Sequence, residues 1–299
     1  MKPPAMRLAA VVLTMGNRPA ELADLIRTVA KQQGEPIDVV VVGNGFVAST
    51  LPELGGARTV DLPENLGIPS GRNHGYRVLL ELPPEQRPDV ILTLDDDGAL
   101  DGDQVAEKLR AAFAENPRLG IVSLRITDPD TGTVQRRHVP RVRVGDPHQS
   151  SPVTTFLGGA NAVRTAVLDE VGVLPDEFFL FHEETDLAWR ALDAGWTIEY
   201  RADLTLHHPA TSPTRHATFH RMVTRNRVWL AKRNLPWPLV PVYLGVWFAL
   251  TLLRARDRTA LRASLGGFAE GLRTDAGPRR PMRWRTVWRM ARLGRPPII

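Results

Sequence analysis

The sequence contains no cysteine, and this absence removes several kinds of chemistry at once. Disulfide bonds, thiolate metal sites and cysteine nucleophiles are excluded, which is compatible with a reducing compartment. We also expect no secretory signal, because the apolar run of residues 8–13 follows the short segment 1–7 directly and no small-residue cleavage pattern comes after it. We therefore expect a cytoplasmic protein.

Long apolar runs are scarce, and the longest uncharged one is the 19 residues 235–253. This length is near the lower limit for a helix that spans a bilayer. Three prolines (Pro236, Pro238 and Pro241) stand in its first third and predict that a regular helix starts only near residue 242. Two arrangements stay open: a segment lying on the anionic inner face of the plasma membrane, or a helix packed internally or on a second subunit.

Acidic residues are almost absent from the end of the chain. Residues 215–299 carry 18 Lys/Arg against 3 Asp/Glu, whereas residues 1–214 carry 20 against 30. We expect two parts: an α/β domain at 1–214 and a basic, helical extension at 215–299. The basic part favours an anionic lipid surface over nucleic acid, because its cations alternate with tryptophans and apolar runs and no recognised nucleic-acid motif accompanies them.

The most informative segment of the chain is residues 91–98, with the sequence ILTLDDDG. The apolar run predicts a buried strand, and the strand delivers Asp95, Asp96 and Asp97 at its carboxyl end, where open α/β sheets bind ligands. Carboxylates this close repel one another unless a cation lies among them. A divalent cation completed by substrate phosphates would meet that demand. A solvated acidic turn before the next helix is the alternative.

Other polar loops follow predicted strands in the amino-terminal half. Residues 8–13, 19–33 and 37–42 predict a strand, a helix and a second strand, which together form a βαβ unit able to hold a nucleotide. Thr14 and Arg18 follow the first of these strands. A glycine-punctuated loop at residues 65–75 leads into a predicted helix at 76–82 and offers backbone N–H groups and Arg72 to a phosphate.

A second acidic group begins at Glu183, directly after the aromatic-rich residues 178–182. The pattern turns helical there and ends at Gly195, which places Glu183 and Asp186 on one face and Glu184 elsewhere. An acidic first turn that complements the helix dipole would explain these residues without any chemistry. Two histidines, His207 and His208, close the acidic part of the chain and point in opposite directions on an extended backbone.

Taken in order, these motifs resemble the inverting family 2 glycosyltransferases, enzymes of the GT-A fold that depend on nucleotide sugars. The resemblance runs from about residue 8 to about residue 212. It implies an α/β fold with a mixed, mostly parallel sheet flanked by helices, followed here by the helical basic extension. It also implies roles for a set of residues. Those expected to bind substrate are Thr14, Arg18, Asn44, Asn65, Gly67, Arg72, Asn73, Asp95, Asp96, Gly158, Gly159, Glu183 and Arg190.

For the metal, the resemblance implies Asp95, Asp97 and His207 as ligands of Mn²⁺ or Mg²⁺, although His208 stays open as the alternative to His207. For catalysis it implies Glu184 as the base, with Asp186 as the second candidate. This chain has Glu184 where the family commonly has aspartate, and Gly43-Asn44-Gly45 where the family commonly has Asp-Asn-Gly. The second departure leaves the base of the nucleotide undetermined.

The implied reaction moves a hexosyl or deoxyhexosyl group from a nucleoside-diphosphate sugar to a hydroxyl of a glycan or glycolipid acceptor, in cell-envelope or polysaccharide synthesis. The cation would offset charge on the leaving diphosphate, and the base would take the proton of the acceptor hydroxyl. Two other functions stay open: a non-catalytic nucleotide-sugar-binding protein, and an enzyme that processes nucleotide sugars by another reaction. The sequence leaves open whether the chain forms an oligomer.

Overall fold

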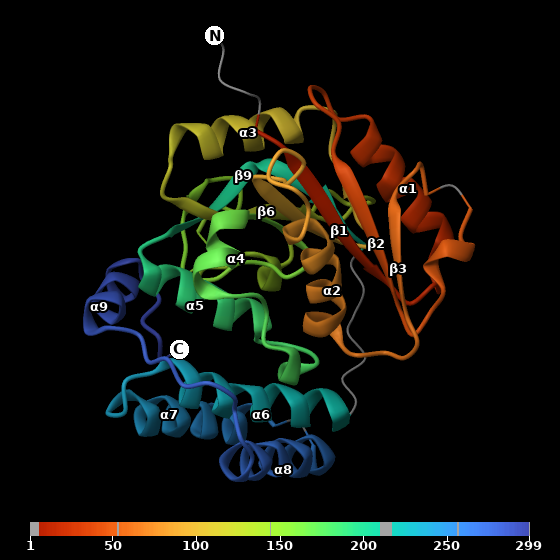
Figure 1. The fold of residues 1–299 in the computed structure, drawn as a ribbon. Coiled ribbons are helices and arrows are strands. Elements are labelled where there is room, and N and C mark those ends of the chain that lie inside the picture. Colours follow the sequence, from red (N-terminus) through yellow and green to blue (C-terminus); the bar gives the residue numbers. More distant parts are fainter. Residues whose placement is uncertain (1–5, 53, 144, 210–216, 256, 299) are drawn as a thin grey trace.

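The structure is a computed structural model that describes residues 6–52, 54–143, 145–209, 217–255 and 257–298. A mixed sheet, drawn in Figure 1, forms its centre in the order β3-β2-β1-β4-β8-β6-β9-β5, with β7 beside β9. Its strands are β1 (Leu8–Thr14), β2 (Asp38–Asn44), β3 (Arg58–Leu62), β4 (Val90–Asp95), β5 (Ala99–Leu100), β6 (Leu119–Thr127), β7 (Ser151–Pro152), β8 (Ala160–Arg164) and β9 (Thr197–His207). The main strands pair in parallel except β8, which runs antiparallel to both β4 and β6.

Helices cover both faces of the sheet, and further helices form the carboxyl-terminal part of the chain. They are α1 (Pro19–Ala30), α2 (Ile68–Leu80), α3 (Val105–Glu115), α4 (Thr165–Val171), α5 (Glu183–Ala194), α6 (Ala217–Asn234), α7 (Leu239–Arg254), α8 (Arg258–Arg273) and α9 (Trp284–Arg292). Side chains alternate along β1, so that Val11 packs in one core with α2, α4 and α5, whereas Val12 packs in the other with α1 and α3. The predicted α/β architecture with a helical extension is confirmed.

Helix α2 begins eight residues earlier than the sequence pattern indicates. Pro69 is tolerated in its first turn, where the backbone N–H has no partner in the helix. A Cβ at Gly71 would lie 2.5 Å from the side chain of Leu13, and one at Gly75 would lie 2.5 Å from that of Val11. These two glycines therefore bring α2 close to β1, and most of the predicted glycine loop is helix.

The carboxyl-terminal helices α6, α7 and α8 pack beneath the α/β part of the protein, on the side of α5 (Figure 1). The expected boundary between residues 214 and 215 lies outside the described residues and stays a prediction. Helix α7 begins at Leu239 and not near 242, because Pro241 falls in its first turn and is tolerated there. In the part of the chain that the structure describes, no helix is long and apolar enough to cross a membrane.

Helix α7 has two different faces. Val240 and Tyr243 are buried, and the ring of Tyr243 meets Trp189 of α5 edge-on with 6.3 Å between centroids. On the other side Leu252 and Leu253 are exposed, Leu253 to 81%. The internal packing considered from the sequence is therefore correct for one face, and the second face is apolar and open.

Candidate functional site

A cavity of about 370 Å³ opens at the carboxyl edge of the sheet, where β1 and β4 end side by side. It lies at the point to which the sequence assigned the first acidic group and the two polar loops. His208, Phe179 and Leu180 line it together with many of the expected residues: Thr14, Arg18, Asn44, Asn65, Gly67, Arg72, Asp95, Asp96 and Asp97.

Each of the three aspartates has its own partner. Arg72 Nη2 donates to Asp95 Oδ1 at 2.8 Å, and Thr14 Oγ1 donates to an oxygen of Asp96 at 2.7 Å. The Arg18 guanidinium pairs with Asp97 Oδ2. The acidic cluster is thus a network built from β1, α2 and β4, which argues against a merely solvated turn.

The electrostatics separate Asp96 from Asp97. Burial raises the pKa of Asp96 to about 6; the hydrogen bond from Thr14 opposes the rise and the charge of Asp97 adds to it. Burial acts in the same sense on Asp97, but the hydrogen bond and charge of His208, with the charge of Arg18, outweigh it and lower the pKa of Asp97. Asp97 is therefore held as an anion, and Asp96 is the carboxylate of this pair that protonates more readily.

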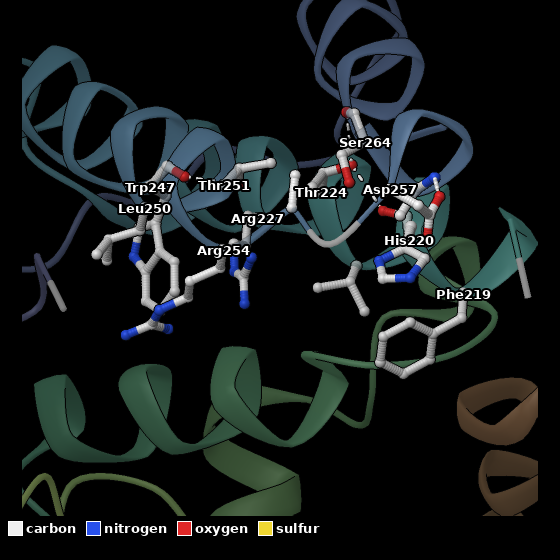
Figure 2. Close-up of a pocket in the computed structure, with 13 residues that line it drawn as sticks. Phe219, His220, Thr224, Arg227, Trp247, Leu250, Thr251, Arg254, Asp257 and Ser264 are labelled. Carbon is white, nitrogen blue, oxygen red and sulfur yellow. Dashed lines mark hydrogen bonds between the residues drawn. The ribbon is translucent and has the colours of Figure 1, made fainter. Parts of the chain in front are cut away.

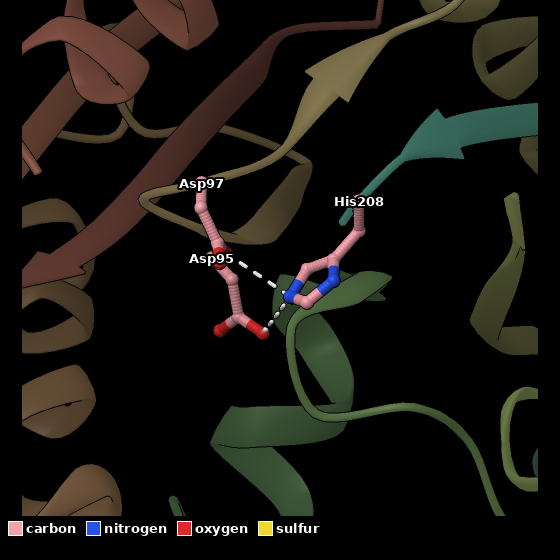
Figure 3. Close-up of side chains that lie close together, drawn as sticks. All are labelled: Asp95, Asp97 and His208. Atoms are coloured by element: carbon pink, nitrogen blue, oxygen red, sulfur yellow. Dashed lines mark ion pairs between the residues drawn. The ribbon is translucent and has the colours of Figure 1, made fainter. Parts of the chain in front are cut away.

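Asp95, Asp97 and His208 form a group whose ligand atoms all lie within 4.8 Å of one another (Figure 3). His208 Nε2 lies 3.1 Å from Asp97 Oδ1 and 3.9 Å from Asp95 Oδ2. Within the described residues, buried Asp97 Oδ1 meets no donor other than this imidazole. Two carboxylates and an imidazole fit Mn²⁺ or Mg²⁺, which take oxygen ligands and, for the softer manganese, nitrogen as well.

His208 faces the aspartates, and His207 does not. His207 Nδ1 shares a hydrogen bond with Thr127 Oγ1 at 2.9 Å, and its Nε2 lies 3.4 Å from Asp101. Neighbouring residues of an extended chain point to opposite sides, so only one of the two can reach the site. The geometry thus corrects the expectation of His207 as a ligand and supports the alternative.

This correction gives a paired test. The substitution His208→Gln should weaken Mn²⁺ binding by more than the roughly 10- to 100-fold that is typical for loss of an outer-shell partner, because it removes a nitrogen that faces both aspartates. The matched variant His207→Gln should bind Mn²⁺ as the unmodified protein does. Isothermal titration with MnCl₂ measures both; equal losses in the two variants, or a loss confined to His207→Gln, would reject the assignment.

The two predicted loop glycines make room for the site. A Cβ on Gly159 would lie 1.8 Å from Asp95 Oδ2, and one on Gly158 would lie 3.0 Å from Arg72 Nη1. The carbonyl of Gly159 also accepts a hydrogen bond from the Asp95 N–H at 3.0 Å. Any side chain at position 159 would displace the Asp95 carboxylate, which explains why an apolar run is interrupted here.

Glu183 and Glu184 begin α5 near the same arginine that holds Asp95. Glu183 Oε1 lies 3.9 Å from Arg72 Nη1, and burial raises the pKa of this glutamate. Burial, followed by the charge of Glu183, raises the pKa of Glu184 to about 8. Glu184 is half-buried and is therefore a carboxylate that can exchange a proton near neutral pH.

Asp186, the second candidate base, is buried and hydrogen-bonded to structural partners. Its side chain has no exposed surface and accepts hydrogen bonds from Arg190 Nε at 2.8 Å, Arg233 Nε at 3.0 Å and Asn234 Nδ2 at 2.7 Å. Burial works against its charge, but the two arginines prevail and lower the pKa of Asp186. Asp186 joins α5 to α6, and this geometry places it outside the site.

Three expected substrate residues also have structural partners. Asn44 accepts from Leu66 N–H at 2.8 Å and so holds the loop around Asn65 and Gly67. Asn73 is fully buried and bonds to the backbone of Leu174. Arg190 donates to the carbonyls of residues 171–173 besides contacting Asp186. Of these three side chains, only Asn44 lines the cavity, and its amide is already engaged.

The sequence did not reveal Asn226, which holds the loop between the cavity and α5. Phe179, Phe181 and His182 all have positive φ, between 60° and 72°, which is strained for residues of this size. Asn226 of α6 donates to the carbonyls of Phe178, Leu180 and Phe181 at 2.7–2.9 Å. The only signal was the aromatic-rich segment 178–182, and nothing in α6 pointed to it.

This sheet, with an acidic cluster and a histidine at its carboxyl edge, is that of a GT-A glycosyltransferase, which confirms the fold that the resemblance implied. The chain belongs to glycosyl transferase family 2, whose model matches residues 10–172, more than half of its length. The predicted family and the predicted class of enzyme are confirmed: the chain is a glycosyltransferase.

Similar proteins fall in the same class. The N-acetylglucosaminyl-diphospho-decaprenol L-rhamnosyltransferase of Mycobacterium tuberculosis is 26% identical over 272 residues, 77% of this chain and 85% of that protein. The S. aureus protein TarS 1–349, solved with UDP-GlcNAc, aligns with a TM-score of 0.61 at 14% identity, over 91% of this chain and 82% of its own. GalNAc-T7, solved with UDP, GalNAc and Mn²⁺, aligns with a TM-score of 0.63 at 11% identity, over 91% and 55%.

Proposed function

We propose that this protein transfers a hexosyl or deoxyhexosyl group, with inversion, from a nucleoside-diphosphate sugar to a hydroxyl of a diphosphate-linked glycolipid acceptor. The observation that carries the proposal is Arg72, which lies 2.8 Å from Asp95 and 3.9 Å from Glu183. One side chain thus couples the candidate cation site to the first turn of α5, where the base stands. The rhamnosyltransferase relative, named for a lipid diphosphate acceptor, supports the choice of acceptor class.

The residues divide the reaction between them. Asp95, Asp97 and His208 would hold Mn²⁺ or Mg²⁺, which supplies positive charge against the diphosphate of the donor. Gly159 leaves Asp95 the space to do so, Arg72 pairs with Asp95, and Arg18 pairs with Asp97, so both carboxylates are held in place. Glu184 accepts the proton of the acceptor hydroxyl as that oxygen attacks the anomeric carbon from the face opposite the leaving group.

A donor screen tests this function. The protein is incubated with UDP-, GDP- and dTDP-sugars, Mn²⁺ and a sugar linked through diphosphate to a short prenyl chain, and release of nucleoside diphosphate and glycosylated product is measured. Acceptor-dependent release from at least one donor is expected. Binding of a nucleotide sugar without release from any donor would instead support the non-catalytic alternative.

We propose, in addition, that the exposed face of α7 contacts anionic membrane, which would bring the site to a lipid-linked acceptor. Leu252 and Leu253 of this face are exposed and directly precede Arg254 in the sequence, and the extension carries 18 Lys/Arg against 3 Asp/Glu. Vesicles containing anionic lipid should carry the protein upward in a flotation gradient at low salt, and added salt should reduce the bound fraction.

The double substitution Leu252→Glu with Leu253→Glu should abolish flotation, because it puts two carboxylates on the apolar face. Val47→Glu is the matched control, since Val47 is an exposed aliphatic residue of the catalytic part. Absence of flotation of the unmodified protein at low salt would refute the membrane contact, as would loss of flotation in the control alone.

A further inference from the structure

A second cavity, of about 470 Å³, lies among α6, α7 and α8, apart from the cavity that holds the aspartates (Figure 2). Its volume is in the range of about 300–1,000 Å³ that is usual for small-molecule sites. On each helix the residues that line the cavity recur every three or four positions, so each helix contributes one of its faces. These residues are Phe219, His220, Val223, Thr224 and Arg227 of α6, Trp247, Leu250, Thr251 and Arg254 of α7, Ala255 and Asp257 before α8, and Ala260 and Ser264 within it.

Two cations, Arg227 and Arg254, line this cavity together. Figure 2 shows Arg227, Arg254 and Trp247 projecting into the same space. The Arg227 guanidinium lies over the Trp247 ring at 3.9 Å from the centroid. Among the residues that the structure describes, neither Arg227 nor Arg254 forms an ion pair, and buried Arg227 Nε and Trp247 Nε1 have no hydrogen-bond partner. The acid of the lining, Asp257, accepts from the Ala260 N–H at 2.7 Å and caps α8.

The charge environment of Arg227 is unfavourable for an isolated cation. Burial lowers the pKa of Arg227, and the charge of Arg254 lowers it further, against an opposing effect of Tyr243. Unpaired buried donors are costly, and an anion with several oxygens would satisfy Arg227 Nε, Trp247 Nε1 and Arg254 together. The polar hydroxyls of Thr224 and Thr251 do not compete, since each already donates to a backbone carbonyl.

The cavity is also connected to the catalytic part. The charge of Arg227 acts on His182, the residue directly before Glu183, and burial and this charge together lower the pKa of that imidazole. Asn226, the neighbour of Arg227 on α6, holds the carbonyls of Phe178, Leu180 and Phe181. An anion at Arg227 would therefore lie beside the loop that positions Glu184.

We propose that this cavity binds the diphosphate of the glycolipid acceptor, with Arg227 and Arg254 on its oxygens and Trp247 and Leu250 against the start of its hydrocarbon chain. The proposal rests on the function proposed above and assigns its acceptor site. The sugar then extends toward Glu184, while the hydrocarbon chain leaves along the apolar face of α7. The helical extension is thereby the part of the protein that selects a phosphorylated acceptor.

The test compares two acceptors that carry the same sugar: one in which the sugar is linked through diphosphate to a short prenyl chain, and the octyl glycoside, which has a hydrocarbon chain but no phosphate. Arg254→Gln should raise the KM for the first by about 10- to 100-fold, the effect of removing a charge-assisted hydrogen bond. The KM for the octyl glycoside should not change. Arg262→Gln, an exposed arginine of α8 outside the cavity, is the matched control. Equal effects on both acceptors, or none on either, would overturn the assignment.

A binding measurement separates failure of this inference from failure of the proposed function. Calorimetry with farnesyl diphosphate in EDTA, which keeps the donor site without metal, should show binding that weakens at least about 10-fold in Arg227→Gln and Arg254→Gln and not in Arg262→Gln. No binding, or equal binding in all variants, refutes the acceptor site whatever the donor screen gives. If a variant binds more weakly but keeps the circular dichroism of the unmodified protein, misfolding is excluded as the cause of the weaker binding.

Discussion

Replacement of Glu184 by glutamine should reduce turnover by roughly 10²- to 10⁴-fold while the affinity for the nucleotide-sugar donor stays nearly unchanged. Glutamine keeps the size and shape of the side chain but cannot accept a proton. Glu184 stands at the start of α5, beside Glu183 and near Arg72, and its pKa is raised to about 8 by burial and by the charge of Glu183. A steady-state series with varied donor and a fixed acceptor separates the fall in kcat from any change in donor KM.

The pH profile adds an independent readout. Because the pKa of Glu184 is raised, the carboxyl is protonated below pH 8 and becomes a base above it. Transfer by the unmodified protein should therefore rise with pH until about 8 and then level off. The residual activity of Glu184→Gln should lack this rise, and an unchanged profile in the variant would move the role of base to another group.

Asp186→Asn is the informative comparison, because its effect should be on stability. The substitution leaves Arg190 and Arg233 without the carboxylate that they share inside the protein. Breaking a buried ion pair in this way costs about 3–5 kcal/mol of unfolding free energy. A lower melting temperature with little loss of kcat fits the position of Asp186 between α5 and α6, whereas a larger kcat loss than in Glu184→Gln would contradict it.

The sequence predicted the parts of the fold that depend on local pattern. Apolar runs identified β1, β2 and β4, and the Asp95–Asp97 group appeared at the end of β4 as expected. The start of α2 was missed because its glycines resemble loop residues, whereas in the structure they allow close packing on Leu13 and Val11. Whether a glycine makes a turn or a close contact depends on the neighbouring strand, which the sequence does not give.

The choice between His207 and His208 shows the same limit. The pairing of β9 with β6 jumps from Arg201 to Thr205, so β9 carries an irregularity that resets which side its later residues face. Alternation from the start of the strand cannot place the histidines once that register shift intervenes. Asn226 was out of reach for another reason, since it contacts carbonyls 45 to 48 positions earlier in the chain.

The candidate cation site leads to the second large effect. Asp97 follows the end of β4, yet its side chain is buried, with 8% of the residue exposed, and is paired with Arg18 and His208. Asn is therefore a better replacement than Ala, because it fills the same volume, and Arg18 is half-exposed and can be hydrated when its partner loses the charge.

Asp97→Asn should abolish transfer and reduce Mn²⁺ affinity by more than the roughly 10- to 100-fold that is typical for loss of an outer-shell partner. The substitution removes an oxygen that, among the described residues, meets no donor except His208 Nε2. Asp101→Asn is the control: Asp101 contacts His207 outside the cation group, so Mn²⁺ binding and turnover should stay at the level of the unmodified protein. Calorimetry with MnCl₂ and a melting curve for each variant give the comparison. If Asp97→Asn keeps its activity and its Mn²⁺ affinity in metal-controlled buffer, the cation does not bind at Asp97.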